Sequence, residues 1–190
     1  MSSVPILFLD IDDVLCVNQP YSGFDLIDVF KGQHADPDAV FQKIFRAHAR
    51  VVLKHIHDEL DEKPRYVISS TWRQHFTREQ MDVIFRKTGL DFVADRLHPI
   101  WATAAISHRC MRSEDIEQWL DEHHEGEPFA ILDDTFSGPS LLPALKSNGH
   151  RFSGRVVLCK ECVGLMPEHV KSLLQALRRT PVIDGQKGAQ

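Results

Sequence analysis

Three aspartates, Asp10, Asp12 and Asp13, follow a short apolar run near the start of the chain. An apolar run of this length is typical of a strand that is buried on both faces of a parallel sheet. Asp10 and Asp12 are two residues apart, so an extended backbone can direct both side chains to the same side. Like charges held this close raise at least one pKa unless they share a cation. The spacing therefore favours a Mg²⁺ site, or an acid paired with a carboxylate nucleophile, over an acidic surface turn.

A second apolar run, at residues 66–69, leads into the hydroxyl side chains of Ser70 and Thr71. Hydroxyl and backbone N–H donors that converge at the end of a strand can bind a phosphate group. The same hydroxyls could instead cap the turn that follows. Arg73, two residues later, could contact a phosphate, cap a helix or pair with an acid.

A later apolar run, at residues 129–132, ends in Asp133 and Asp134 and so repeats the pattern of acids after a buried strand. In open α/β sheets, ligands bind at the carboxyl ends of the strands. We therefore expect these acids, the first acids and the hydroxyls to lie along one edge of a sheet.

Strand-like runs alternate with helix-like periodicity, which predicts an α/β, Rossmann-like three-layer sandwich with a central parallel sheet and no large cap domain. One domain is expected over residues 1–180, with a flexible tail at residues 181–190. The remaining expected segments are a loop or hairpin at 16–36, a long helix at 37–60 that Asp36 caps, a helix at 77–89, a strand at 90–93, a loop at 94–112, a helix that Ser113 caps, a loop and short helix at 138–154, a strand at 156–158 and a helix at 167–179.

The 190-residue chain is 43% hydrophobic and 26% charged, as in ordinary soluble domains, and its net charge of -5 argues against a strongly basic nucleic-acid surface. No apolar run approaches the ~20 residues of a membrane span. We therefore expect no membrane association and a cytoplasmic protein, and we favour a monomer. Cys159 and Cys162 have CxxC spacing, but no second pair follows, which disfavours a structural zinc site.

The stretch LDIDDVL at residues 9–15 resembles the first motif of the haloacid dehalogenase (HAD) superfamily, in which apolar residues precede Asp, any residue and a second Asp. Asp10 matches the nucleophile of that motif, and Asp12 matches the acid/base. The stretches SSTWR and RSEDIEQWL are similar to the HAD domains of the Swiss Army Knife RNA repair group. The resemblance covers residues 5–180 and implies a HAD-like fold.

The resemblance also implies which residues bind phosphate. A Ser or Thr closes the second strand of HAD enzymes; Ser70 fits best, and Ser69 is the alternative. A basic residue near a later helix holds the nucleophile and phosphate. Arg112 fits this role, with Arg109 and Lys146 as alternatives.

For the metal, the resemblance implies Mg²⁺ bound by Asp10, the backbone carbonyl of Asp12, and Asp133. Asp134 is either a further ligand or a partner of the basic residue. Carboxylate and carbonyl oxygens are suitable Mg²⁺ ligands.

These roles predict a phosphomonoester hydrolase in which Asp10 forms an aspartyl phosphate and Asp12 serves as acid and then base. The carboxyl group of Asp12 argues against dehalogenase chemistry. An open site would suit a large substrate such as a phosphorylated RNA or DNA end or a phosphoprotein. The alternatives are a small-molecule phosphatase covered by residues 16–36, and a binding module without turnover.

Overall fold

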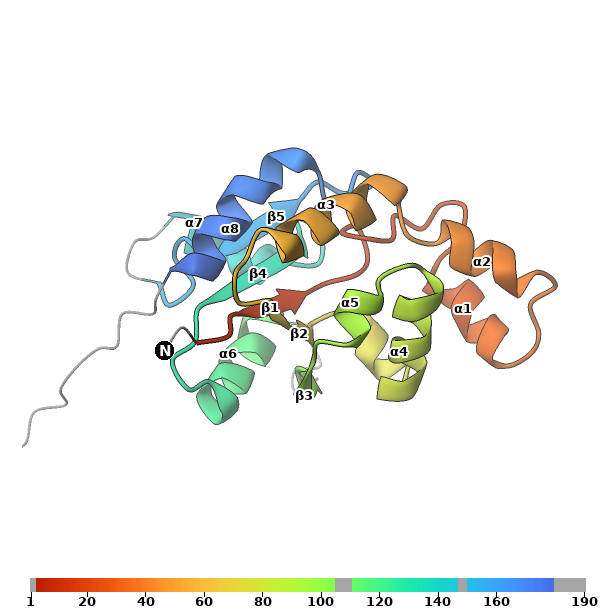
Figure 1. Ribbon diagram of the computed structural model, residues 1–190, viewed down its shortest axis with the longest axis horizontal. Helices are drawn as coiled ribbons and strands as arrows, with labels where there is room; N and C mark the ends of the chain where they lie inside the picture. Colours follow the sequence, from red (N-terminus) through yellow and green to blue (C-terminus); the bar gives the residue numbers. More distant parts are fainter. Residues whose placement is uncertain (1–2, 105–110, 147–149, 180–190) are drawn as a thin grey trace, which may run out of the picture.

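The computed structural model describes residues 3–104, 111–146 and 150–179. Its centre is one parallel sheet with the strand order β3-β2-β1-β4-β5 (Figure 1). The strands are β1 (Ile6–Leu9), β2 (Arg65–Ile68), β3 (Leu97–Ala102), β4 (Phe129–Asp134) and β5 (Val156–Cys159). Within the sheet, Leu9 of β1 pairs with Ile68 of β2 and with Leu132 of β4.

Helices connect these strands and cover the sheet. The α-helices are α1 (Gly23–Phe30), α2 (Pro37–Lys43), α3 (Ala47–Asp58), α4 (Arg78–Lys87), α5 (Asp91–Ala94), α6 (Arg112–His123), α7 (Leu142–Lys146) and α8 (Val170–Arg178). Three short 3₁₀ helices are η1 (Thr71–Gln74), η2 (Pro139–Leu141) and η3 (Pro167–His169). No helix in the described part of the chain is long and apolar enough to cross a membrane.

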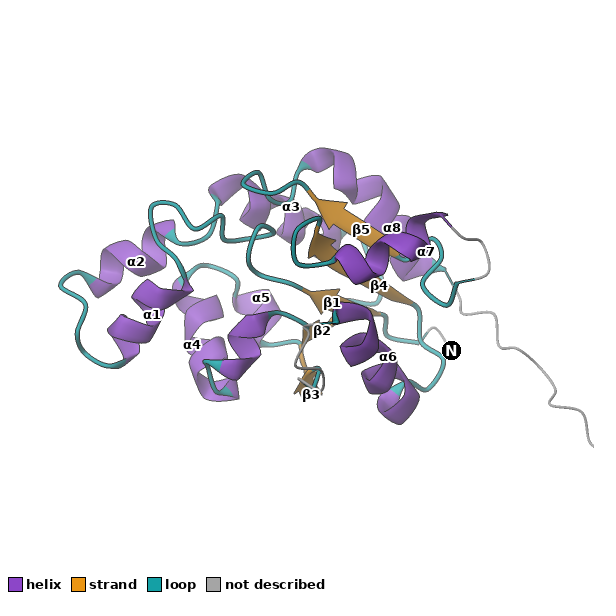
Figure 2. Ribbon diagram, turned by 180° about the vertical axis from the view of Figure 1, so that it is seen from behind, coloured by secondary structure: helices purple, strands orange, loops and turns teal. Residues whose placement is uncertain are grey.

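The side chains of β1 alternate between two buried apolar clusters, one on each face of the sheet. Leu7 and Leu9 belong to the cluster that includes α3, α4 and α8. Ile6 and Phe8 belong to the cluster that includes α6, where the Phe8 and Trp119 rings pack edge to face with centroids 5.2 Å apart. Figures 1 and 2 show α3 and α8 on the face opposite α6. The predicted three-layer α/β architecture is confirmed.

The order of the strands reverses between β1 and β4. The chain moves from β1 to β2 and β3 toward one edge, and it then returns past β1 to form β4 and β5. Helices of the first two connections lie on one face, whereas α6 crosses back on the other. Ligands bind at such a reversal of strand order, outside the carboxyl ends of the strands. The fold thus brings Asp10, after β1, next to the acids at the end of β4.

Several predicted elements are confirmed, and two near the start of the chain were wrong. The helix at 77–89 is α4, with Thr77 and Gln80 forming its capping box. The predicted loop at 16–36 instead contains α1. The predicted long helix at 37–60 is broken into α2 and α3, because Arg46 is extended and its N–H donates to the carbonyl of Leu15 at 2.8 Å.

Residues 90–112 also differ from the prediction. The expected strand at 90–93 is replaced by α5, a single helical turn. The expected loop at 94–112 contains β3, an edge strand with a mixed burial pattern and therefore no continuous apolar run. Pro99 lies within β3, which an edge strand tolerates. The next helix, α6, begins at Arg112, before the expected cap at Ser113. The predicted tail at 181–190 lies outside the described residues.

Candidate active site

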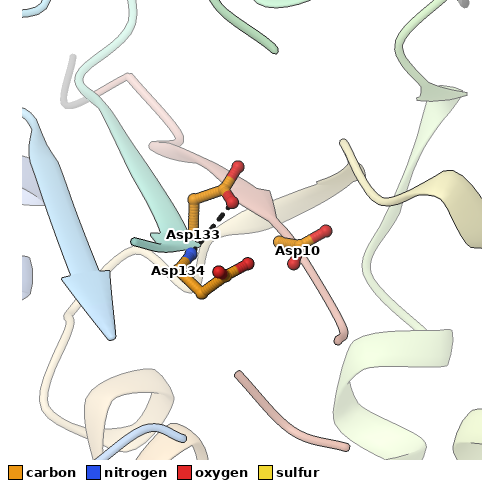
Figure 3. A group of neighbouring side chains, drawn as sticks. All are labelled: Asp10, Asp133 and Asp134. Carbon is orange, nitrogen blue, oxygen red and sulfur yellow. Dashed lines mark hydrogen bonds between the residues drawn. The ribbon is translucent and has the colours of Figure 1, made fainter. Parts of the chain in front are cut away.

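Three carboxylates meet at the carboxyl ends of β1 and β4 (Figure 3). Asp10 follows β1 directly, and Asp133 and Asp134 are the last two residues of β4. One carboxylate oxygen from each lies within 4.8 Å of the other two. All three residues are at most 1% exposed to solvent. Of the four aspartates predicted to hold metal, these three come together through their side chains.

Arg112, the first residue of α6, contacts this group from the face of the sheet that α6 covers. Its Nη2 donates to Asp10 Oδ1 at 3.0 Å, and its Nε lies 2.8 Å from Asp133 Oδ2. Arg112 is itself buried. It is thus the basic candidate that the structure places beside the predicted nucleophile. Lys146 is exposed on α7, and Arg109 lies outside the described residues.

The charges of the cluster are unbalanced, since one guanidinium faces three carboxylates. Burial raises the pKa of Asp10 well above its ordinary value and Asp133 raises it further, whereas Arg112 opposes the shift. Burial also raises the pKa of Asp133. Asp10 Oδ2 is buried with no hydrogen-bond partner among the described residues. Three converging carboxylates and an unpartnered buried oxygen fit a divalent cation that prefers oxygen ligands.

Asp12 lies beside the cluster, but its carboxylate is not part of it. Asp12 Oδ2 accepts a hydrogen bond from Trp72 Nε1 at 3.0 Å. Burial raises the pKa of Asp12, and the bond from Trp72 partly offsets that effect. Proton transfer by the Asp12 side chain and metal binding by its backbone carbonyl both stay predictions.

Ser69 and Ser70 differ in how their hydroxyls are used. Ser70 Oγ accepts from Trp72 N at 3.4 Å and so caps η1. Ser69 Oγ is buried with no hydrogen-bond partner among the described residues. Ser69 continues β2, so strand alternation puts its side chain on the same face as Val67 and Asp10, the face that α6 covers. Ser69, the predicted alternative, thus has the unpartnered hydroxyl on the face of Asp10, and phosphate binding by Ser69 or Ser70 stays a prediction.

Arg73 joins the end of β2 to the start of α6. It donates to the carbonyl oxygens of Ser69 at 2.7 Å and Ser70 at 2.6 Å, and to Asp115 Oδ2 at 2.6 Å. Asp115 lies in the first turn of α6, three residues after Arg112. Arg73 thus pairs with an acid, one of its predicted roles, and it fixes α6 relative to the strand that carries Ser69.

The turn after β4 wraps closely around the acids. Asp134 Oδ1 accepts from the N–H groups of Phe136 at 2.6 Å and Ser137 at 2.9 Å. The Ser137 hydroxyl lies within hydrogen-bond distance of the carboxylates of both Asp133 and Asp134. A Cβ on Gly138 would lie 2.7 Å from the carbonyl oxygen of Asp134 and 3.2 Å from Asp133 Oδ1. The turn therefore requires glycine at this position to hold the acids in place.

The other singled-out residues lie outside the acid cluster. Thr71, predicted to bind phosphate, begins η1 and lines a cavity beside Asp12. Asp13 Oδ1 accepts from Cys162 N at 2.7 Å and so connects two loops. Cys159 is buried and Cys162 is exposed, and both are free thiols. Sequence reasoning missed the contacts that Trp72 and Asp115 make in the site, because no local pattern marks them.

Comparison with known proteins gives one match. Residues 6–170 match the family described as the HAD domain in Swiss Army Knife RNA repair proteins. No curated protein and no solved structure matches the chain. The matched segment includes Asp10, Ser69, Arg112 and both acids of β4, and it covers most of the chain. The chain therefore belongs to the family of HAD domains found in Swiss Army Knife RNA repair proteins.

Proposed function

We propose that the protein is a Mg²⁺-dependent phosphomonoester hydrolase that acts through an aspartyl phosphate on Asp10. Membership of the HAD family indicates a hydrolase in the broad sense. The observation that carries the finer proposal is the burial of Asp10 between two further acids and Arg112 at the carboxyl edge of the sheet. Such a site can bind a cation and an anionic phosphate together.

Mg²⁺ would be held by Asp10, Asp133, Asp134 and the backbone carbonyl of Asp12. When bound, the ion supplies positive charge that offsets the repulsion between a carboxylate nucleophile and a phosphate ester. The unpartnered Oδ2 of Asp10 and the raised pKa values of Asp10 and Asp133 support this assignment, because both indicate a need for positive charge.

In the first step, an oxygen of Asp10 attacks phosphorus and the bond from phosphorus to the leaving oxygen breaks. Asp12 in its protonated form donates its proton to the leaving oxygen, and its raised pKa supports that role. In the second step, Asp12 accepts a proton from the water that hydrolyses the aspartyl phosphate. Arg112 and Ser69 stabilise the remaining phosphoryl oxygens by charge and by hydrogen bonding.

The substrate we propose is a phosphorylated end of RNA or DNA. The description of the matching family, which names RNA repair proteins, supports this class. A small phosphate ester is the second candidate, favoured by a cavity of about 390 Å³ beside Asp12. A module that binds phosphate without turnover would be the third.

The test is phosphate release with and without Mg²⁺ from end-phosphorylated RNA and DNA, mononucleotides, sugar phosphates and phosphopeptides. Asp10→Asn is the blank, and Asp38→Asn, an exposed acid on α2, is the matched control. We expect Mg²⁺-dependent release that Asp10→Asn abolishes and Asp38→Asn retains. Near-normal turnover by pure Asp10→Asn would refute the mechanism, and no release from any ester would favour the binding module.

A salt titration of oligonucleotide binding separates the two substrate classes. Contacts with several phosphates make affinity fall steeply with salt, since each contact releases counterions. A steep slope supports a nucleic-acid substrate. A shallow slope, together with preference for small esters, supports the small-molecule phosphatase.

A further inference from the structure

A cavity of about 390 Å³ opens beside Asp12, between α1 and η1. Its apolar walls are Phe24 and Ile27 of α1, Trp72 of η1, and Phe76. Its volume is in the range of pockets that bind small organic groups, and mostly apolar walls with a few polar groups are usual for such pockets. This cavity is separate from the acid cluster, which holds the nucleophile.

The wall formed by Trp72 is fixed on both sides. Trp72 is buried, and its indole N–H donates to Asp12. A Cβ on Gly23 would lie 3.2 Å from the indole ring, so the absence of a side chain at Gly23 lets the start of α1 approach the ring. Leu26 is fully buried and anchors α1 in the core. The cavity is thus built on packed elements.

Phe24 is the unusual residue of this cavity. It lines the cavity, yet it is 75% exposed to solvent. An exposed aromatic ring beside a cavity can stack on a planar group, because aromatic faces attract one another and every nucleobase has such a face. Polar side chains of Asn18, Thr71 and His75 also line the cavity and can pair with ring heteroatoms.

Asp12 lines the cavity and is also the acid of the proposed reaction. An acid that protonates the leaving oxygen must lie within hydrogen-bond reach of it. Asp12 forms part of the cavity wall, so the cavity begins next to the position that this oxygen must occupy. We propose that the cavity binds the nucleobase of the nucleotide that carries the scissile phosphate, with Phe24 stacked on its face. This assignment rests on the proposed function, because Asp12 defines the leaving group.

The first test measures binding rather than turnover. The probes are adenosine 3′- and 5′-monophosphate and, as a ligand without a ring, glycerol 3-phosphate. Calorimetric titrations use the Asp10→Asn protein with Mg²⁺, alone and combined with Phe24→Ala, Phe24→Tyr or Val51→Ala. Val51 is 68% exposed on α3, outside the cavity, and serves as the matched control.

We expect Phe24→Ala to lower the ratio of nucleotide affinity to glycerol phosphate affinity by about tenfold, since the stacking of the base on the Phe24 ring is lost. Phe24→Tyr should restore the ratio, and Val51→Ala should leave it unchanged. An unchanged ratio in Phe24→Ala, or equal weakening of all three ligands, would overturn the assignment.

Phosphate release from the same esters separates this assignment from the proposed function. Absence of hydrolysis together with a Phe24-dependent affinity ratio would refute the hydrolase and retain the cavity as a nucleobase site. Hydrolysis of all esters with an efficiency ratio that Phe24→Ala does not change would retain the hydrolase and overturn the assignment.

Discussion

Replacing Arg112 with methionine removes the positive charge that lies between Asp10 and Asp133, and its effect on stability should depend on Mg²⁺. The guanidinium lies 3.0 Å from an oxygen of Asp10 and 2.8 Å from an oxygen of Asp133, and all three groups are buried. Removing one partner of a buried ion pair destabilises a protein by about 3–5 kcal/mol, because the remaining charge is left without compensation. We expect a loss of this size for Arg112→Met in EDTA.

Mg²⁺ should reduce this loss, because a bound cation replaces the missing charge. A ligand that binds the folded state stabilises it by an amount set by its affinity. The stability loss of Arg112→Met in EDTA minus its loss in saturating Mg²⁺ therefore equals the difference in Mg²⁺ binding free energy between the variant and the wild type. We expect the loss to be at least about 1.4 kcal/mol smaller in Mg²⁺, which corresponds to tenfold tighter binding. The variant should nevertheless hydrolyse phosphate esters poorly, since it lacks the group that stabilises phosphoryl oxygens.

The assay is urea denaturation of wild type, Arg112→Met and Arg112→Lys in EDTA and in Mg²⁺, at pH 6 and pH 8. Removing Arg112 raises the pKa of Asp10 further, since Arg112 lowers it in the wild type. When the pKa of a carboxyl group is higher in the folded state than in the unfolded state, stability falls as the pH rises through the folded-state value. The stability loss of Arg112→Met in EDTA should therefore be larger at pH 8 than at pH 6. Arg112→Lys keeps the charge and should show a smaller Mg²⁺ effect. An equal loss in EDTA and Mg²⁺, or identical behaviour of the two variants, would refute this electrostatic account.

Three further predictions concern other parts of the structure. Gly138→Ala should lower stability by about 1–3 kcal/mol and weaken Mg²⁺ binding in calorimetry, because its Cβ would lie 2.7 Å from the carbonyl oxygen of Asp134. Ser69→Ala should lower kcat/KM for phosphate esters with little effect on stability, whereas Ser70→Ala should lower the unfolding free energy by about 0.5–2 kcal/mol through loss of a cap. Burial lowers the pKa of His57 from 6.5 to about 4, so the unfolded state binds more protons between these values. Wild-type stability in urea should therefore fall as the pH drops through that range, and His57→Gln should have a shallower slope.

The sequence could predict the sheet and the place of the acids because strands buried on both faces leave continuous apolar runs. The apolar runs before Asp10 and Asp133 are fully buried in β1 and β4. Asp10 follows β1 as predicted, whereas Asp133 and Asp134, expected after the strand, are the last two residues of β4. β3 gave no such signal, since an edge strand exposes part of its surface and Pro99 interrupts its pattern.

Long-range contacts determine the structural features that the sequence could not predict. The break between α2 and α3 depends on a backbone bond from Arg46 to Leu15, and helical periodicity continues across it. The bond from Trp72 to Asp12 joins residues 60 positions apart. Such contacts depend on the completed fold, so local propensity carries no information about them.

The ambiguity between Ser69 and Ser70 has a different physical origin. A shift of one residue at the end of a strand moves a side chain to the other face of the sheet. The sequence located the second strand but left its last residue uncertain, and therefore also the face of each hydroxyl. The observed pairing of Leu9 with Ile68 resolves this, because it sets Ser69 opposite Asp10.

Asp10 and Asp12, the two acids of the proposed reaction, are held by partners from different faces of the sheet. Asp10 is held by Arg112, which comes from α6 on one face of the sheet. Asp12 is held by Trp72, which packs in the apolar cluster of the other face. Displacement at phosphorus requires the attacking and leaving oxygens to be roughly in line, on opposite sides of the phosphoryl group. The proposed reaction therefore requires Asp12 to protonate the leaving oxygen on the side of the phosphoryl group away from Asp10, and the cavity that Phe24 lines begins beside Asp12.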